Sequence, residues 1–127
     1  MEIRQLYKGL SVCGQLTAED ISEVKALGFK LVICNRPDGE EASQCDCGTI
    51  GQAVQAAGME YLYLPVSPGT SAHDTIQAFG DALKQPGPVL AYCRTGNRCS
   101  ILWAQSQMGK LPTQTIVESV NALGFQI

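Results

Sequence analysis

The chain contains the sequence Val89-Leu90-Ala91-Tyr92-Cys93-Arg94-Thr95-Gly96-Asn97-Arg98-Cys99-Ser100, in which an apolar run ends at a cysteine and a short polar loop follows. The apolar run predicts a buried strand, and behind Arg98 a pattern typical of a helix extends from Ser100 to Met108. A loop that curls ahead of a helix N-terminus turns several backbone N–H groups inward and forms a cradle for an anion. We therefore expect Cys93 to lie in an anion-binding loop between a strand and a helix.

A cysteine in such a loop is predicted to be a nucleophile. The positive end of the helix and the Arg98 guanidinium both stabilise the thiolate, which predicts a fall in the pKa of Cys93 from about 8.5 into the range of about 3.5–7.5. Cys93 and Arg98 are therefore the candidate catalytic residues of an enzyme. The residues between them are candidates for substrate binding: Arg94, Thr95, Gly96 and Asn97.

Predicted strands and helices alternate along the chain. Strands are predicted over 10–13, 29–34 and 59–66 and from Val89 onward, and helices over 17–27, 49–57, 72–84, 100–108 and 112–123. This order predicts right-handed crossovers and one α/β domain over 1–127, a small three-layer sandwich with a mostly parallel sheet of about four to five strands. Ligands of such sheets bind at the C-terminal ends of the strands.

Composition and charge exclude several classes of partner. The 127 residues carry a net charge of −3 with no basic run, so neither nucleic acid nor an anionic membrane is an expected partner. No apolar stretch approaches a membrane span, and 1–5 lack the apolar region of a signal peptide. We expect a cytoplasmic protein whose six cysteines are free thiols.

Cys45-Asp46-Cys47 is one C-x-C pair in an expected mobile loop, so no metal or cofactor is predicted.

The cysteine loop resembles those of two enzyme superfamilies. Cysteine-dependent protein phosphatases have His-Cys, five residues, Arg and then Ser or Thr, whereas rhodanese sulfurtransferases often have a shorter Tyr-Cys-Arg-x-Gly-x-Arg loop. Here Tyr92 precedes the cysteine and four residues separate Cys93 from Arg98, which is closer to the rhodanese loop.

Four stretches in order resemble a narrower family: 12–16, 35–40, 64–66 and 92–98. The family is the phosphatase-like domain of beta-lactamase hydrolase-like proteins, also described as a sulfurtransferase family. The resemblance implies a dual-specificity-phosphatase-like fold, with a true rhodanese fold as the alternative. Because such domains also occur fused to persulfide dioxygenases and sulfide:quinone oxidoreductases, these enzymes are expected partners, beside a small anionic sulfur donor and a thiol acceptor such as glutathione.

Two features favour sulfur chemistry over phosphate chemistry. The short loop suits a single sulfane sulfur on Cys93. Phosphatases of this fold need a general acid after the preceding strand, and here Ser67 and Pro68 follow Val66. We expect transfer of sulfane sulfur from thiosulfate or a persulfide to a thiol through a Cys93 persulfide. The alternatives are a cysteine-based phosphatase acting through a Cys93 phosphocysteine, and a degenerate binding module.

Three further residues are candidates for the site. Arg36 and Asp38 follow a predicted strand at the ligand-binding edge, where they either bind substrate or form a turn and a local ion pair. Asp38 is also the acid that a phosphatase could use from the neighbouring loop. Cys99 stands where the family pattern has serine, and it is either a resolving thiol or a space-filling residue. Ser100, one position later, reads as an ordinary helix residue.

Overall fold

The computed structural model describes residues 1–69 and 71–126, and these residues form a five-stranded sheet in the order β1-β2-β5-β3-β4. The strands are β1 Arg4–Tyr7, β2 Leu10–Cys13, β3 Leu31–Cys34, β4 Glu60–Tyr63 and β5 Val89–Tyr92. All neighbouring strands run parallel except β1 and β2. The predicted mostly parallel sheet is confirmed, and β1 is a strand that the sequence pattern did not predict.

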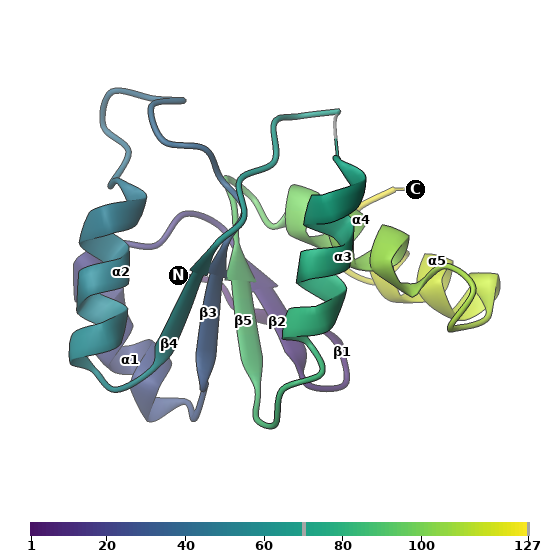
Figure 1. The fold of residues 1–127 in the computed structure, drawn as a ribbon, viewed down its shortest axis with the longest axis horizontal. Coiled ribbons are helices and arrows are strands. Elements are labelled where there is room, and N and C mark those ends of the chain that lie inside the picture. Colours follow the sequence, from purple (N-terminus) through teal and green to yellow (C-terminus); the bar gives the residue numbers. More distant parts are fainter. Residues whose placement is uncertain (70, 127) are drawn as a thin grey trace.

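Helices cover both faces of the sheet. They are α1 Ile21–Ala26, which follows a 3₁₀ turn over Ala18–Asp20, α2 Cys47–Ala56, α3 His73–Ala82, α4 Asn97–Gln107 and α5 Thr113–Asn121. Helices α1 and α2 lie on one side of the sheet, and α3, α4 and α5 lie on the other (Figure 1). The predicted three-layer sandwich is therefore confirmed.

The central strand β5 is buried on both faces, which explains its unbroken apolar sequence. Leu90 and Tyr92 pack in the core with α1 and α2, whereas Val89 and Ala91 pack in the core with α3, α4 and α5. Cys93, the residue after β5, belongs to this second core and is 1% exposed. Successive side chains along β5 point to opposite faces of the sheet, and the Cys93 side chain therefore points toward the layer that contains α4.

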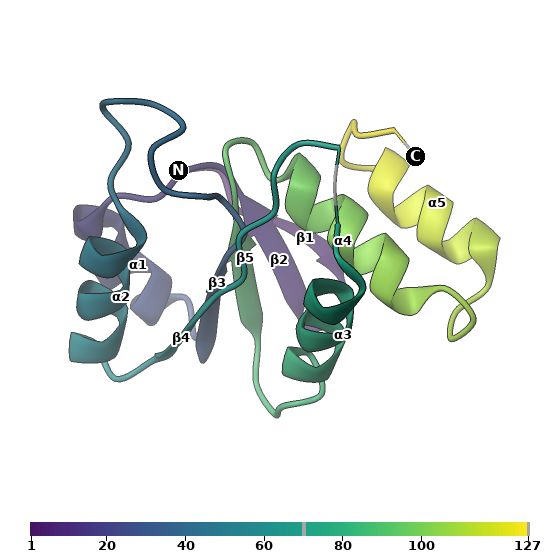
Figure 2. The ribbon, with the colours of Figure 1, turned by 45° about the horizontal axis from the view of Figure 1, so that its top comes forward.

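The carboxyl ends of the parallel strands meet at one edge of the sheet. Cys13 and Cys34, the last residues of β2 and β3, both pair with Tyr92. The loops that follow β3, β4 and β5 all rise at this edge (Figure 2). Residues from three separate stretches of sequence can therefore meet around Cys93.

Two helices begin earlier than predicted. Helix α4 begins at Asn97 instead of Ser100, so that Arg98 and Cys99 lie in its first turn. Helix α2 begins at Cys47 instead of Thr49, because the Asp46 carboxylate accepts a hydrogen bond from the Thr49 N–H at 2.7 Å. The expectation of a mobile loop is thus wrong for Cys47, which starts a helix.

Within the described ranges, none of the helices has the length and apolar character needed to cross a membrane.

Candidate active site

Cys93 lies in a loop that stabilises its thiolate. The Gly96 N–H donates a hydrogen bond to Cys93 Sγ at 3.1 Å. The pKa of Cys93 is lowered to about 5, chiefly by a hydrogen bond from the Cys99 thiol and then by the backbone N–H groups of Cys99, Thr95 and Gly96, while burial opposes the shift. Cys93 is therefore an ionised nucleophile at neutral pH.

The loop owes its shape to two glycines. Gly96 has a φ of 94°, in the left-handed region that favours glycine, and this conformation places its N–H against the sulfur. A Cβ on Gly14, in the loop after β2, would stand 2.9 Å from the Arg94 carbonyl oxygen. The cysteine loop is therefore packed directly against the neighbouring backbone.

Ser100 braces the loop and is more than an ordinary helix residue. Its Oγ donates to the Gly96 carbonyl oxygen at 2.9 Å, and its backbone N–H donates to the same oxygen at 3.1 Å. Both groups are buried. These two bonds fix Gly96, which in turn donates to Cys93.

Cys99 lies next to Cys93, where the sequence pattern suggested a resolving thiol or a space-filling residue. Its side chain is fully buried, and burial is the main cause of a pKa well above the ordinary value, with the nearby Cys93 as a second cause. Cys99 therefore stays a neutral thiol that donates to the Cys93 thiolate.

Arg98 is held by the Glu40 carboxylate, which was not among the predicted site residues. Its two terminal nitrogens donate to the two oxygens of Glu40, at 2.8 Å each, and Nη1 also donates to the Val66 carbonyl oxygen at 2.8 Å. The Glu40 pairing is the main cause of a raised Arg98 pKa, and the Cys93 thiolate contributes to it. Arg98 thus links the loops after β3, β4 and β5.

Arg36 lies beneath this pair, with only 4% of its side chain exposed. It donates to Glu40 at 3.0 Å, to Glu41 at 3.0 Å and to the Gln15 side-chain oxygen at 3.0 Å. Arg36 therefore holds the loop after β3 in place, and its guanidinium contacts protein groups on three sides.

Of the remaining loop candidates, Arg94 and Thr95 lie at the surface and Asn97 is half-buried. The Arg94 side chain is 68% exposed and forms an ion pair with Glu41 at 3.3 Å. Thr95 is exposed, and its Oγ1 accepts a hydrogen bond from the Asn97 N–H at 3.3 Å. The side chains of Arg94 and Thr95 therefore lie on the exposed side of the loop.

The Asp38 side chain lies against the first residue of α2. Its carboxylate accepts hydrogen bonds from the Cys47 N–H at 2.8 Å and from the Cys47 thiol at 3.0 Å. The Asp38 backbone N–H donates to the Tyr63 hydroxyl at 3.1 Å. The structure therefore pairs Asp38 with Cys47.

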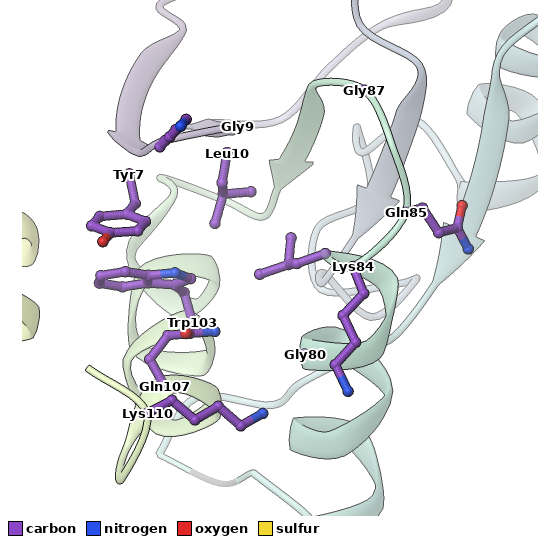
Figure 3. Close-up of a pocket in the computed structure, with 12 residues that line it drawn as sticks. Tyr7, Gly9, Leu10, Gly80, Lys84, Gln85, Gly87, Trp103, Gln107 and Lys110 are labelled. Carbon is purple, nitrogen blue, oxygen red and sulfur yellow. The ribbon is translucent and has the colours of Figure 1, made fainter.

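A separate hollow of about 420 Å³ lies at the opposite edge of the sheet (Figure 3). Tyr7, Leu10 and Trp103 line it, and the rings of Tyr7 and Trp103 are 5.2 Å apart. Leu10 begins β2, so the hollow lies at the amino ends of the parallel strands, away from Cys93. Because ligands of parallel sheets bind at the carboxyl ends, we assign the chemistry to the Cys93 loop.

Solved structures share this architecture. A protein of Neisseria meningitidis described as a candidate phosphatase is 37% identical, with a TM-score of 0.83 over 96% of this chain and 88% of that chain. TpbA of P. aeruginosa has a TM-score of 0.69 at 21% identity, over 97% of this chain and 74% of that one. Kinase-associated phosphatase has a TM-score of 0.73 at 15% identity, over 89% and 74%. The last two show the fold alone, which is that of cysteine phosphatases, as predicted.

Longer relatives contain the same domain. Two proteins described as beta-lactamase hydrolase-like are 32% identical in Agrobacterium fabrum and 29% identical in Xylella fastidiosa, each over 100% of this chain. The chain spans 30% of the length of each of these relatives. The family model described as beta-lactamase hydrolase-like protein, phosphatase-like domain, matches residues 2–110, and the chain belongs to this family.

Proposed function

We propose that the protein is a sulfurtransferase that carries sulfane sulfur on Cys93. In the first step the Cys93 thiolate attacks the outer sulfur of R–S–SH, a new S–S bond forms, and R–S⁻ leaves with the electron pair of the broken bond. In the second step an acceptor thiolate attacks the outer sulfur of the Cys93 persulfide and restores the Cys93 thiolate. Both steps conserve charge and need no oxidant.

The observation that carries the proposal is the state of the carboxyl groups around the loop. Glu40 has a pKa lowered to about 2, chiefly by its hydrogen bond from Arg98, so it holds no proton at neutral pH. Glu41 is paired with Arg36 and Arg94. A phosphate ester needs a proton for its alkoxide leaving group, whereas a thiolate or sulfite leaves without one.

The other candidate acids are engaged elsewhere or absent from the expected place. Asp38 accepts two hydrogen bonds from Cys47. Ser67 and Pro68 occupy the position after Val66 where phosphatases of this fold carry their acid. Sulfur transfer is therefore the chemistry that best suits the groups available.

A cysteine-dependent phosphatase is the second candidate. The likeness to the Neisseria meningitidis protein described as a candidate phosphatase, at 37% identity, favours it. In that reaction the Cys93 thiolate would attack phosphorus and form a phosphocysteine, which water would then hydrolyse.

Partners follow from the proposed chemistry. Glutathione is a suitable thiol acceptor, and a persulfide dioxygenase or a sulfide:quinone oxidoreductase is a suitable neighbour in sulfide metabolism. The relatives' additional length leaves room for such a second activity in the same polypeptide.

Parallel assays of the purified protein test the proposal. Thiosulfate or a persulfide plus a thiol should give turnover and add one sulfur atom to Cys93 by mass spectrometry, and Cys93→Ser should lose both. Rapid hydrolysis of an aryl phosphate that depends on Cys93, without a sulfur adduct, would establish the phosphatase instead.

A further inference from the structure

Arg98, the arginine that ends the cysteine loop, has little capacity left for a substrate anion. A guanidinium has five N–H donors, and the structure commits three of them, two to Glu40 and one to the Val66 carbonyl. The Arg98 side chain is only 11% exposed, so the ion pair lies largely out of solvent. A substrate that claimed both terminal nitrogens would have to displace Glu40.

Glu40 is clamped from two sides and is therefore hard to displace. Besides Arg98, the buried Arg36 donates to the same carboxylate at 3.0 Å. Bidentate arginine–carboxylate contacts combine charge with fixed geometry, which makes them stronger than contacts through a single hydrogen bond. Glu40 thus acts as an internal anion that is already bound beside the loop.

The charges around the loop cancel. Among residues 1–69 and 71–126, the charged groups joined in this network are three arginines, two glutamates and one thiolate: Arg36, Arg94, Arg98, Glu40, Glu41 and Cys93. A dianion that approaches this thiolate therefore meets no net positive charge to offset the repulsion. A molecule with at most one charge near the reacting atom is repelled less strongly by the thiolate.

We propose that Glu40 is a specificity-determining residue that excludes dianions from the Cys93 loop and selects organic persulfides, R–S–SH, as sulfur donors over thiosulfate. The proposal deepens the sulfurtransferase function and rests on it for the identity of the donor. The selection by charge itself is a property of the loop and can be measured on Cys93 independently of sulfur transfer.

Two aryl disulfides that differ in charge, one neutral and one a dianion, measure this selection directly. Dithiodipyridine is neutral and dithiobis(nitrobenzoate) is a dianion, and each releases a coloured thiol when the Cys93 thiolate attacks its S–S bond. Rate constants are taken near pH 6, where Cys93 with its pKa of about 5 is ionised, and the rate of Cys93→Ser is subtracted. Glu40→Gln should raise the rate with the dianion about tenfold, which is a change of about 1.4 kcal/mol, and change the neutral rate less than about twofold.

The matched control is Glu41→Gln, which removes the same charge from the adjacent residue without touching Arg98. It should change the ratio of the two rates far less than Glu40→Gln. Equal shifts of both probes in Glu40→Gln would overturn the proposal and leave Glu40 as a brace of the loop. Equal effects of the two variants would also overturn it.

The unmodified protein supplies a test that needs no variant to fold. Its kcat/KM should be at least about tenfold higher with 2-hydroxyethyl persulfide than with thiosulfate, and equal or faster use of thiosulfate would overturn the selection. If neither donor places sulfur on Cys93 while the disulfide probes still show the charge selection, the sulfurtransferase function fails and the role of Glu40 in excluding dianions stands.

Discussion

Cys93 and Cys47 both lie at a helix N-terminus and differ in their chemistry. Cys93 precedes α4 and its pKa is lowered to about 5, whereas Cys47 begins α2 and its pKa is raised to about 11. Burial raises the pKa of both thiols. The hydrogen-bond partners make the difference, because Cys93 accepts from the Cys99 thiol and from backbone N–H groups, whereas Cys47 donates to the Asp38 carboxylate at 3.0 Å.

The comparison shows that a helix N-terminus does not by itself activate a thiol. A positive helix end favours a thiolate, yet at Cys47 burial and, after it, the hydrogen-bonded Asp38 carboxylate outweigh this effect and raise the pKa. At the Cys93 loop the Glu40 carboxylate is instead occupied by two arginines. The following substitutions test this contrast, in order of expected effect.

The largest effect is expected when Cys93 is replaced by serine, and the same replacement of Cys47 is the control. Cys93→Ser should abolish sulfur transfer, since a hydroxyl in the loop stays protonated and cannot carry the sulfur. Cys47→Ser should retain turnover. Thiosulfate–thiol and persulfide–thiol assays on both variants give the answer, and loss of activity in Cys47→Ser would mean that the α2 thiol relays sulfur.

Arg98→Lys should lower kcat/KM by about 10²-fold with thiosulfate and with an uncharged sulfane donor alike, the loss that a displacement of about 1 Å in a positioned group can cause. The Arg98 guanidinium joins Glu40 to the Val66 carbonyl, and lysine keeps the charge but cannot make these bonds with one rigid planar group. Kinetics with both donors measure the effect, and a much larger fall with thiosulfate would mean that Arg98 also binds the substrate anion.

Cys99→Ala should raise the pKa of Cys93 by roughly 1–2 pH units, because the thiolate loses the donor that lowers its pKa most. The pH profile of alkylation by a neutral reagent, followed at Cys93 by mass spectrometry, should move to higher pH. Cys99→Ser keeps a hydroxyl donor and should move the profile less. An unchanged profile in Cys99→Ala would show that the backbone N–H groups suffice.

Asp38→Asn should lower the pKa of Cys47 by roughly one pH unit, because the negative acceptor becomes neutral. The same alkylation profile, recorded at Cys47 in a Cys93→Ser background, measures it. A rise, or no change, would mean that burial alone sets the behaviour of Cys47.

Much of the fold could be predicted because local patterns decide it. The unbroken apolar run of β5 predicts burial on both faces, and the alternation of strands with helices predicts the parallel sheet and its edge for the site. Strand β1 escaped this reasoning, because Arg4–Tyr7 carries little apolar pattern and owes its conformation to pairing with β2. Its tertiary contacts outweigh its weak local preference.

The site was predicted less completely. Cys93 and Arg98 stand in one motif, and their spacing identifies the loop. Glu40 lies 58 residues from Arg98 in sequence, and only folding selects it from the other acids as the partner of Arg98. The string 35–40 contains Glu40 and was singled out, yet its spacing does not indicate which cation the carboxylate meets. The same holds for Asp38, which binds Cys47.

The central position of β5 in the sheet also determines at which stage of unfolding the active site is disrupted. β5 is paired with β2 on one side and β3 on the other, so its amide protons are expected to exchange with solvent only through large openings, whereas β1 and β4 lie at the edges and are expected to open more easily. The Cys93 loop is thus attached to the strand that is expected to separate last. On heating, the reactivity of the thiolate is therefore expected to persist through fraying of the edges and to vanish together with global unfolding.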